Sequence, residues 1–252
     1  MSLIVDGAHL GTSDADWLSA DRFETMKPLR PRPPARLVIV SPHPDDETFG
    51  AGALIQVRGG GDEVPVNVIC VTDGDGSHPL AVADGLDMRT IRRGEQQRAL
   101  SRLGVREPLL NRLALPDGQV NLHVDELAGR LADALGPDDV CVAPWWRDGH
   151  PDHDACGQAA RLATQATGTL LLAYLVWTWH WAGPAGSDLP WSDCRLLPLD
   201  RPEAARKRWA SGAFVSQIRP LGPDRDEEPL LPSAVLRRFW RPFEVFIEDQ
   251  EA

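Results

Sequence analysis

The sequence predicts a single α/β domain in which a mostly parallel sheet lies between two layers of helices, a Rossmann-like three-layer sandwich. Three observations lead to this fold class. Short, nearly continuous apolar runs alternate with longer segments of helical periodicity, the order expected of a parallel sheet covered on both faces. The 252 residues suit one such domain. No internal repeat divides the chain, so we expect one domain over residues 35–252, behind an extension at residues 1–34.

The expected strands cover residues 36–41, 65–72, 109–115, 140–143 and 169–176. The expected helices between them cover residues 46–58, 88–103, 122–135 and 153–167. The N-terminal extension reads as irregular and ends in a proline-rich, extended lead-in to the first strand. The pattern is less regular after residue 176: a short helix is expected at 201–211, and irregular loops at 177–200 and 219–233. Together with the loop at 73–87, these loops are expected to shape a pocket beyond the carboxyl ends of the strands.

Composition and charge exclude several classes of protein. A formal net charge of −11 repels phosphate backbones and anionic lipid, so nucleic acids and membrane surfaces are not expected partners. No apolar stretch approaches the ~20 residues of a membrane span, and no secretory signal is visible. The four scattered cysteines are typical of free thiols in a reducing compartment, which predicts a cytoplasmic protein. Nine tryptophans are compatible with a homo-oligomer.

A cluster of histidine and acidic residues follows the first expected strand directly and opens the first expected helix. Its sequence is Ser-Pro-His-Pro-Asp-Asp-Glu over residues 41–47. His43 and Asp46 lie three residues apart across a turn, so both can face one point, with Asp45 beside them. Imidazole nitrogen and carboxylate oxygen are ligands that suit zinc. A helix cap would account for one aspartate, but not for the histidine and the second aspartate together.

A second cluster, Asp-Gly-His-Pro-Asp-His-Asp over residues 148–154, follows the fourth expected strand and also opens a helix. Because the carboxyl ends of parallel strands meet at one edge of the sheet, we expect the two clusters to lie together. His43, Asp46 and His153 would then supply three protein ligands and leave a fourth position open for water. That arrangement is typical of a catalytic zinc site, and Fe2+ is an alternative divalent ion.

The two clusters together resemble the PIG-L/LmbE-like N-deacetylases, a family that includes enzymes acting on GlcNAc-phosphatidylinositol, GlcNAc-inositol and GlcNAc-malate. The residues that carry the resemblance are His-Pro-Asp-Asp-Glu after the first strand and Gly-His-Pro-Asp-His after a later one. It extends over about residues 36–176, with further matches at residues 71–74 (Val-Thr-Asp-Gly), in the helix around Arg92 and at residues 115–118 (Leu-Pro-Asp-Gly).

The resemblance implies a role for each matching residue. His43, Asp46 and His153 would bind zinc, and Asp45 would be the general base. His150 would stabilise the oxyanion and protonate the leaving amine. Arg92 and Asp117 fall where the family contacts its substrate.

Four further residues are candidates from their position in the second cluster or directly before it. Trp145 and Trp146 precede it, and their apolar ring faces could stack on a sugar ring. Asp152 or its neighbour Asp154 either orients His150 as a supporting carboxylate or simply caps the helix.

The predicted function is therefore a zinc-dependent hydrolase that removes an N-acetyl group from a GlcNAc-containing small molecule or glycoconjugate. One alternative is a zinc amidase acting on a non-sugar N-acyl group. A Rossmann-type cofactor-binding protein would need a glycine-rich turn after the first strand, where this chain has His-Pro-Asp-Asp-Glu. A non-catalytic metal-binding or carbohydrate-binding module would need neither Asp45 nor His150.

Overall fold

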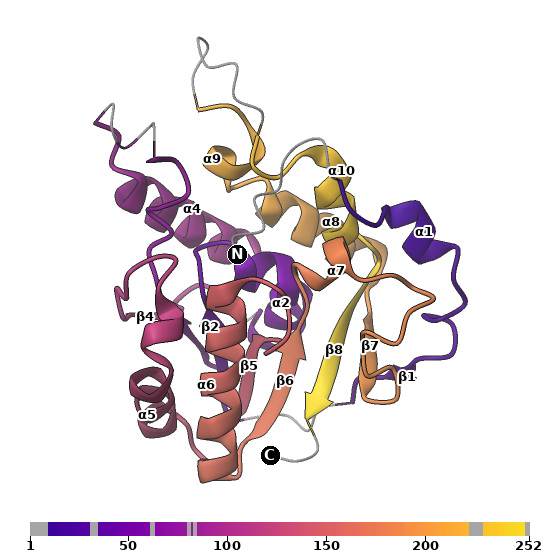
Figure 1. Cartoon of the computed structure of the whole chain (residues 1–252), viewed down its shortest axis with the longest axis horizontal. Helices are drawn as coiled ribbons and strands as arrows, with labels where there is room; N and C mark the ends of the chain where they lie inside the picture. Colours follow the sequence, from indigo (N-terminus) through magenta and orange to yellow (C-terminus); the bar gives the residue numbers. More distant parts are fainter. Residues whose placement is uncertain are drawn as a thin grey trace.

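The structure, a computed structural model, describes residues 10–30, 35–60, 64–79, 82, 85–221 and 229–249. The described residues form one eight-stranded sheet with helices on both faces (Figure 1). Its strands are β1 (Lys27–Pro28), β2 (Leu37–Ser41), β3 (Val66–Cys70), β4 (Leu109–Arg112), β5 (Val140–Pro144), β6 (Leu170–Tyr174), β7 (Cys194–Pro198) and β8 (Phe243–Asp249). They lie in the order β1-β7-β8-β6-β5-β2-β3-β4. Of the described pairs, only those that involve β8 are antiparallel, which confirms the predicted mostly parallel α/β fold.

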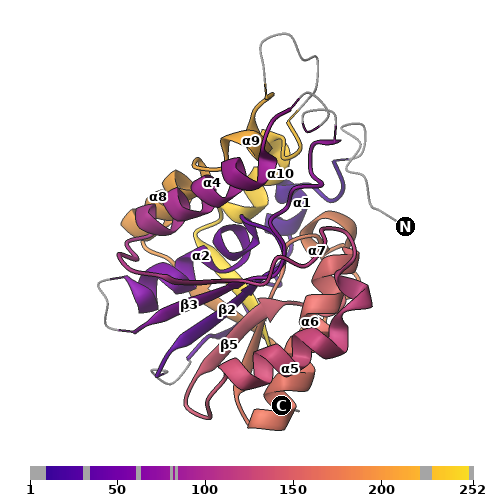
Figure 2. The same ribbon diagram turned by 90° about the vertical axis from the view of Figure 1, so that its left-hand side faces the viewer.

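The helices lie in two layers, one on each face of the sheet, as Figure 2 shows. The layer containing α2 (Asp46–Gly59), α4 (Met88–Arg102) and α8 (Arg201–Ser211) packs on one face, and α5 (Val124–Ala134) and α6 (Pro151–Thr167) pack on the other. Shorter helices are α1 (Asp14–Leu18), α7 (Thr178–Trp181), α9 (Val215–Ile218), α10 (Ser233–Leu236) and the 3-10 turns η1 (Val120–Leu122) and η2 (Arg237–Phe239).

The central strand β2 shows why its sequence is apolar throughout. Successive side chains of a strand point to opposite faces of the sheet. Leu37 and Ile39 accordingly join the apolar cluster under α2, α4 and α8, whereas Val38 and Val40 join the cluster under α5 and α6. Helices cover both faces of the sheet at β2, so its side chains are buried on both sides and no polar alternation is needed.

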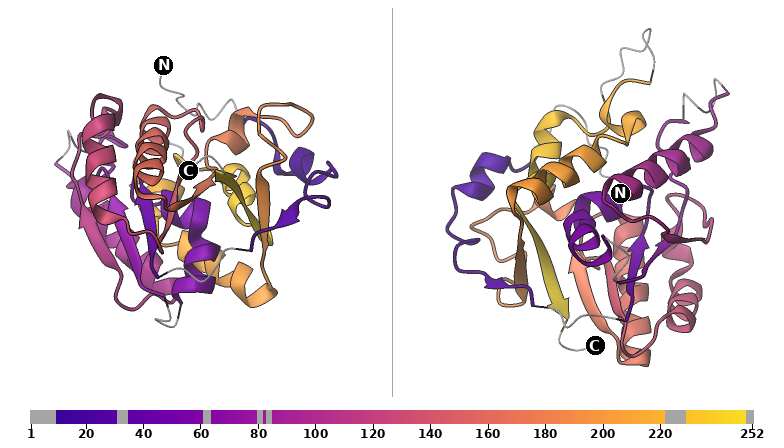
Figure 3. Two further views of the ribbon diagram at one scale, coloured as in Figure 1. Left: turned by 90° about the horizontal axis from the view of Figure 1, so that it is seen from below. Right: turned by 180° about the vertical axis from the view of Figure 1, so that it is seen from behind.

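The segments at the two ends of the sheet differ from the sequence predictions. The expected irregular extension contains α1, and its Trp17 is fully buried against the C-terminal part of the chain (Figure 3). Arg241 stacks on the Trp17 ring and donates a hydrogen bond from Nε to Asp14. The expected loop at 177–200 contains α7 and ends in β7, which pairs with β1 and β8. Of the loops expected at 73–87 and 219–233, residues 80, 81, 83, 84 and 222–228 lie outside the described residues.

A buried ion pair ties the C-terminal strand to helix α2. Lys207 on α8 and Glu244 on β8 are 2.5 Å apart, and their side chains are only 3% and 2% exposed. Lys207 Nζ also donates to the carbonyl oxygen of Phe49, while Glu244 accepts the backbone N–H groups of Ala53 and Leu54. The two charged side chains therefore bind backbone groups in the middle of helix α2.

None of the helices in the described part of the chain combines the length and apolar character that crossing a bilayer requires.

Candidate metal centre

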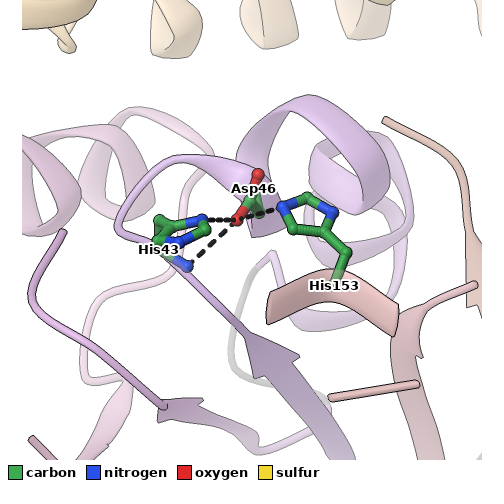
Figure 4. A group of neighbouring side chains, drawn as sticks. All are labelled: His43, Asp46 and His153. Atoms are coloured by element: carbon green, nitrogen blue, oxygen red, sulfur yellow. Dashed lines mark hydrogen bonds and ion pairs between the residues drawn. The ribbon is translucent and has the colours of Figure 1, made fainter. Parts of the chain in front are cut away.

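The two predicted clusters meet at the carboxyl edge of the sheet. The strands that precede them, β2 and β5, are neighbours with Ile39 opposite Val142. The first cluster continues from β2 into α2, and the second follows β5 and opens α6. Figure 4 shows His43, Asp46 and His153 facing one another across this junction. His43 Nδ1 and His153 Nε2 each lie 3.1 Å from Asp46 Oδ2.

The donor set fits a divalent cation. His153 is fully buried, and its Nε2 atom has no hydrogen-bond partner although it lies close to Asp46. On the other side of the ring, His153 Nδ1 is 2.8 Å from Asp148 Oδ2. A carboxylate partner places the ring proton on Nδ1, so the Nε2 lone pair faces Asp46. Two lone-pair donors directed at each other in a dry site are stabilised by a cation between them.

Charge at this point supports the same conclusion. Burial by itself would lower the pKa of His153, but Asp46 and Asp148 on either side raise that pKa to about 9. Burial likewise acts to raise the pKa of Asp46, and the neighbouring His153 and His43 bring it well below its ordinary value. The carboxylates of the site therefore favour positive charge at these imidazoles, and a bound metal ion would supply such charge.

His43 is held by carboxylates on both of its nitrogens. While Nδ1 faces Asp46, Nε2 lies 3.1 Å from Asp117 Oδ1 and 3.1 Å from Asp152 Oδ2. Asp152 also accepts the backbone N–H groups of Gly118 and Val120. The side chain of Asp152 thus supports the ligand His43 rather than His150, a role that spacing alone did not indicate.

Asp117 lies at the same imidazole. Its second oxygen accepts the backbone N–H of Gly76 at 2.8 Å. Burial opposes ionisation of Asp117, but His43 lowers its pKa to about 2. Asp117 therefore joins the site by contacting His43, and it is 14% exposed.

Asp45 lies beside the three candidate ligands and is paired with Arg92. The Arg92 Nη2 atom is 3.0 Å from Asp45 Oδ2, and Arg92 also donates to the carbonyl oxygens of Gly74 and Pro44. Burial raises the pKa of Asp45 to about 7, with Arg92 acting in the opposite direction. A carboxylate with a pKa near 7 is suited to accept and return a proton at neutral pH. The Arg92 side chain is buried, only 3% exposed, and forms its ion pair with Asp45 inside the protein.

His150 is the N-cap residue of α6, and its Nδ1 atom accepts the backbone N–H of Asp152 at 3.2 Å. Burial, together with the nearby His153 and His43, lowers the pKa of His150 to about 3. This lowered pKa favours the neutral ring, whose proton is then on Nε2 because Nδ1 accepts the N–H of Asp152. Two other imidazoles lie with ring centroids 5.0 and 5.1 Å from that of His150.

The aromatic residues of the site are not the pair that the sequence indicated. Trp145 is 2% exposed within the apolar core, and Trp146 packs beneath Arg161, 4.9 Å from its guanidinium. Trp177 instead stacks on His150, with ring centroids 5.8 Å apart and planes at 22°. Nearby Trp181 is 39% exposed and donates its indole N–H to the carbonyl oxygen of Asp148. Trp177 is the N-cap residue of the short helix α7, and Trp181 is its last residue.

Fold and side chains together define an α/β protein with a candidate metal centre of histidines and carboxylates at the edge of its sheet. Residues 38–164, which are 127 of the 252 residues, match the model of the PIG-L family, described as GlcNAc-PI de-N-acetylase. The chain belongs to this family.

Individual proteins resemble the chain more distantly. It is 28% identical over 130 residues to a probable N-acetyl-alpha-D-glucosaminyl L-malate deacetylase 2 of Bacillus subtilis (strain 168), a match covering 49% of this chain and 58% of the relative. Little more than half of that relative's length is therefore matched. The A40926 pseudoaglycone deacetylase Dbv21 aligns with a TM-score of 0.60 at 22% identity, over 86% of this chain and 98% of its own. The zinc-inhibited form of the teicoplanin deacetylase Orf2 aligns with a TM-score of 0.59 at 19% identity, over 86% of this chain and 100% of its own. At these identities the structural likeness shows the shared fold.

Proposed function

We propose that the protein is a metal-dependent N-deacetylase that hydrolyses the N-acetyl group of a GlcNAc-containing small molecule or glycoconjugate, releasing acetate and a free amine. Membership of the PIG-L family supports the class of reaction, and the malate-linked GlcNAc relative supports the class of substrate. The observation that carries the proposal is the convergence of His43 Nδ1 and His153 Nε2 on Asp46 Oδ2, each at 3.1 Å, with Asp45 beside them.

His43, Asp46 and His153 would hold the metal ion, through Nδ1, a carboxylate oxygen and Nε2. When bound, a divalent ion such as zinc, or alternatively Fe2+, polarises the acyl oxygen and lowers the pKa of a coordinated water from about 15.7 towards 7.

Asp45 would accept the proton of the attacking water. Its raised pKa allows it to hold that proton and then to give it to the leaving nitrogen, while Arg92 keeps the carboxylate in place. Because His150 is neutral, its contribution is a hydrogen bond from Nε2–H to the oxyanion that forms on the substrate carbonyl. One donor of this kind is typically worth about 3–4 kcal/mol in the transition state.

Trp177 is the aromatic side chain best placed to contact a sugar ring. Its stacking on His150 puts it at the side of the candidate metal centre, where the apolar CH face of a pyranose could lie against it. Asp117 remains a candidate hydrogen-bond acceptor for sugar hydroxyls because it is partly exposed at the same edge.

The test is acetate release by the purified protein from a panel of GlcNAc conjugates and simple N-acetyl amines, with and without a chelator. We expect release from GlcNAc conjugates only, lost on chelation and restored by zinc. Asp45→Asn should retain the metal and lose turnover by about 10²–10⁴-fold, the usual contribution of general acid–base catalysis. His153→Ala should lose both metal and turnover. Equal metal loss in the two variants, or release from simple N-acetyl amines alone, contradicts the assigned roles or the substrate class.

A further inference from the structure

Asp148 lies at the start of the second cluster and is fully buried. Its carboxylate accepts five hydrogen bonds, one from the metal-ligand candidate His153 and four from residues 176–178. Oδ2 lies 2.8 Å from His153 Nδ1 and accepts the N–H of Trp177 at 3.0 Å. Oδ1 accepts the N–H of Val176 at 3.1 Å and both the N–H and the hydroxyl of Thr178, at 2.9 and 2.6 Å.

The four other bonds fix the position of α7. The carboxylate lies at the first turn of this four-residue helix, where exposed N–H groups favour an anion. The backbone of the second cluster adds a further contact, because the Asp148 carbonyl oxygen accepts the indole N–H of Trp181 at 2.6 Å. The next residue, Gly149, has φ +95°, and a Cβ at this position would lie 2.6 Å from the indole nitrogen of Trp181. The chain is therefore built for close contact between residues 148–150 and 176–181.

We propose that Asp148 is a positioning residue that orients the metal ligand His153 and, through the same carboxylate, holds Trp177 beside His150. The proposal rests on the proposed function, because it concerns the metal affinity and substrate contact of that site. The Asp148 side chain would thereby fix both the direction of the His153 Nε2 lone pair and the position of the Trp177 ring.

The chemistry of the carboxylate explains why this residue is an aspartate. Five donors point at its two oxygens, and an ionised carboxylate can accept all of them. An asparagine of the same shape would turn an NH2 group towards either His153 or the N–H groups of α7. Buried donors would then face each other, and the contact of residue 148 with either His153 or α7 would be lost.

The principal test is the zinc affinity of the full-length protein, measured by competition with a chromogenic chelator. For Asp148→Asn we expect zinc binding weaker by about 10- to 100-fold, the usual effect of removing the hydrogen-bond partner of a ligating histidine. At saturating zinc, the KM for the N-acetylated substrate should also rise. Asp154→Asn is the matched control, because Asp154 lies in the same first turn of α6 but accepts the N–H of Gly149. Its zinc affinity should stay close to that of the wild type.

A second variant separates the two roles. Trp177→Leu removes the aromatic face and leaves the Asp148–His153 bond intact. Its KM should rise with unchanged zinc affinity, a combination that general destabilisation does not produce. If Asp148→Asn folds with wild-type zinc affinity, or if Trp177→Leu leaves KM unchanged, the proposal is overturned.

A measurement that needs no variant covers the case in which Asp148→Asn does not fold. In zinc-loaded protein carrying 15N-labelled histidine, His153 should show a protonated, slowly exchanging Nδ1 and an unprotonated Nε2. The opposite tautomer would remove the basis of the proposal. Failure of the proposed function itself would look different, because wild-type protein would then bind zinc tightly without releasing acetate, or would bind none.

Discussion

The buried pair of Lys207 and Glu244 gives a stability prediction that can be worked from the structure. Lys207→Met keeps the length of the side chain but removes the cation and its two hydrogen bonds, to Glu244 and to the Phe49 carbonyl. Glu244 is then left as a buried charge supported only by the N–H groups of Ala53 and Leu54. Removing one partner of a buried ion pair typically costs about 3–5 kcal/mol.

We expect the lower end of this range, near ~3 kcal/mol, because the two N–H groups continue to stabilise the carboxylate. For a chain of this length such a loss lowers the melting temperature by about 6–12 °C. The assay is urea unfolding followed by far-UV circular dichroism, in the presence of a chelator so that metal binding does not add to the difference.

Lys27→Met is the matched control, since Lys27 is exposed on β1 and undergoes the same chemical change. Its free energy of unfolding should change by less than about 0.5 kcal/mol. If Lys207→Met is equally mild, the reasoning fails, and helix α2 must restore its own hydrogen bonds once the two side chains separate. A double variant with Glu244→Gln should recover part of the loss, because it also removes the unpaired charge.

Three further predictions follow from packing, burial and the metal centre. Gly157→Ala should destabilise the protein by more than about 2 kcal/mol in thermal unfolding, because the added Cβ would lie 2.6 Å from backbone atoms of Pro144 and Trp146. The control Gly129→Ala, on the exposed face of α5, should stabilise it by about 0.5–1 kcal/mol. Equal effects of the two substitutions would contradict the packing of α6 on β5. At pH 8 a thiol reagent should label none of the four buried cysteines in native protein and all four in denaturant. The reason is that burial raises the pKa of three of these thiols to about 12 and that of the fourth well above its ordinary value. Rapid labelling of the native protein would disprove the prediction. Zinc at about 100 times its Kd should stabilise the fold by about 2.7 kcal/mol in urea unfolding without the chelator, and an unchanged transition would argue against the metal centre.

Much of the fold could be predicted from the sequence where local pattern and tertiary environment agree. The central strands are buried on both faces, so their apolar runs are continuous and easily recognised, and the helices between them have capping and periodicity of their own. Strand β8 could not be recognised in this way. It joins the sheet antiparallel between β6 and β7, and its residues 243–249 mix acidic and apolar side chains because Glu244 serves helix α2 instead of solvent.

The candidate metal site shows the same division. The spacing within residues 41–47 and 148–154 indicated which side chains could meet, and the structure brings His43, Asp46 and His153 together. The supporting contacts could not be read from spacing. The Asp148 carboxylate reaches residues 176–178 because β5 and β6 are neighbours, and Asp152 reaches residues 118 and 120 because helix α6 packs against the turn η1. The lowered pKa of His150 likewise comes from burial first and then from His153 and His43, which the folded chain brings together.

The pairing of β2 with β5 separates what is fixed in this protein from what is free to vary. The candidate ligands follow two strands that are hydrogen-bonded to each other near the centre of the sheet, so the pairing of these strands sets their separation. Other groups around the candidate site come from α7 and from the turns around Gly76 and Gly118. We expect changes in the length of those turns to alter the surroundings of the site while the distances among the candidate ion-binding atoms stay the same.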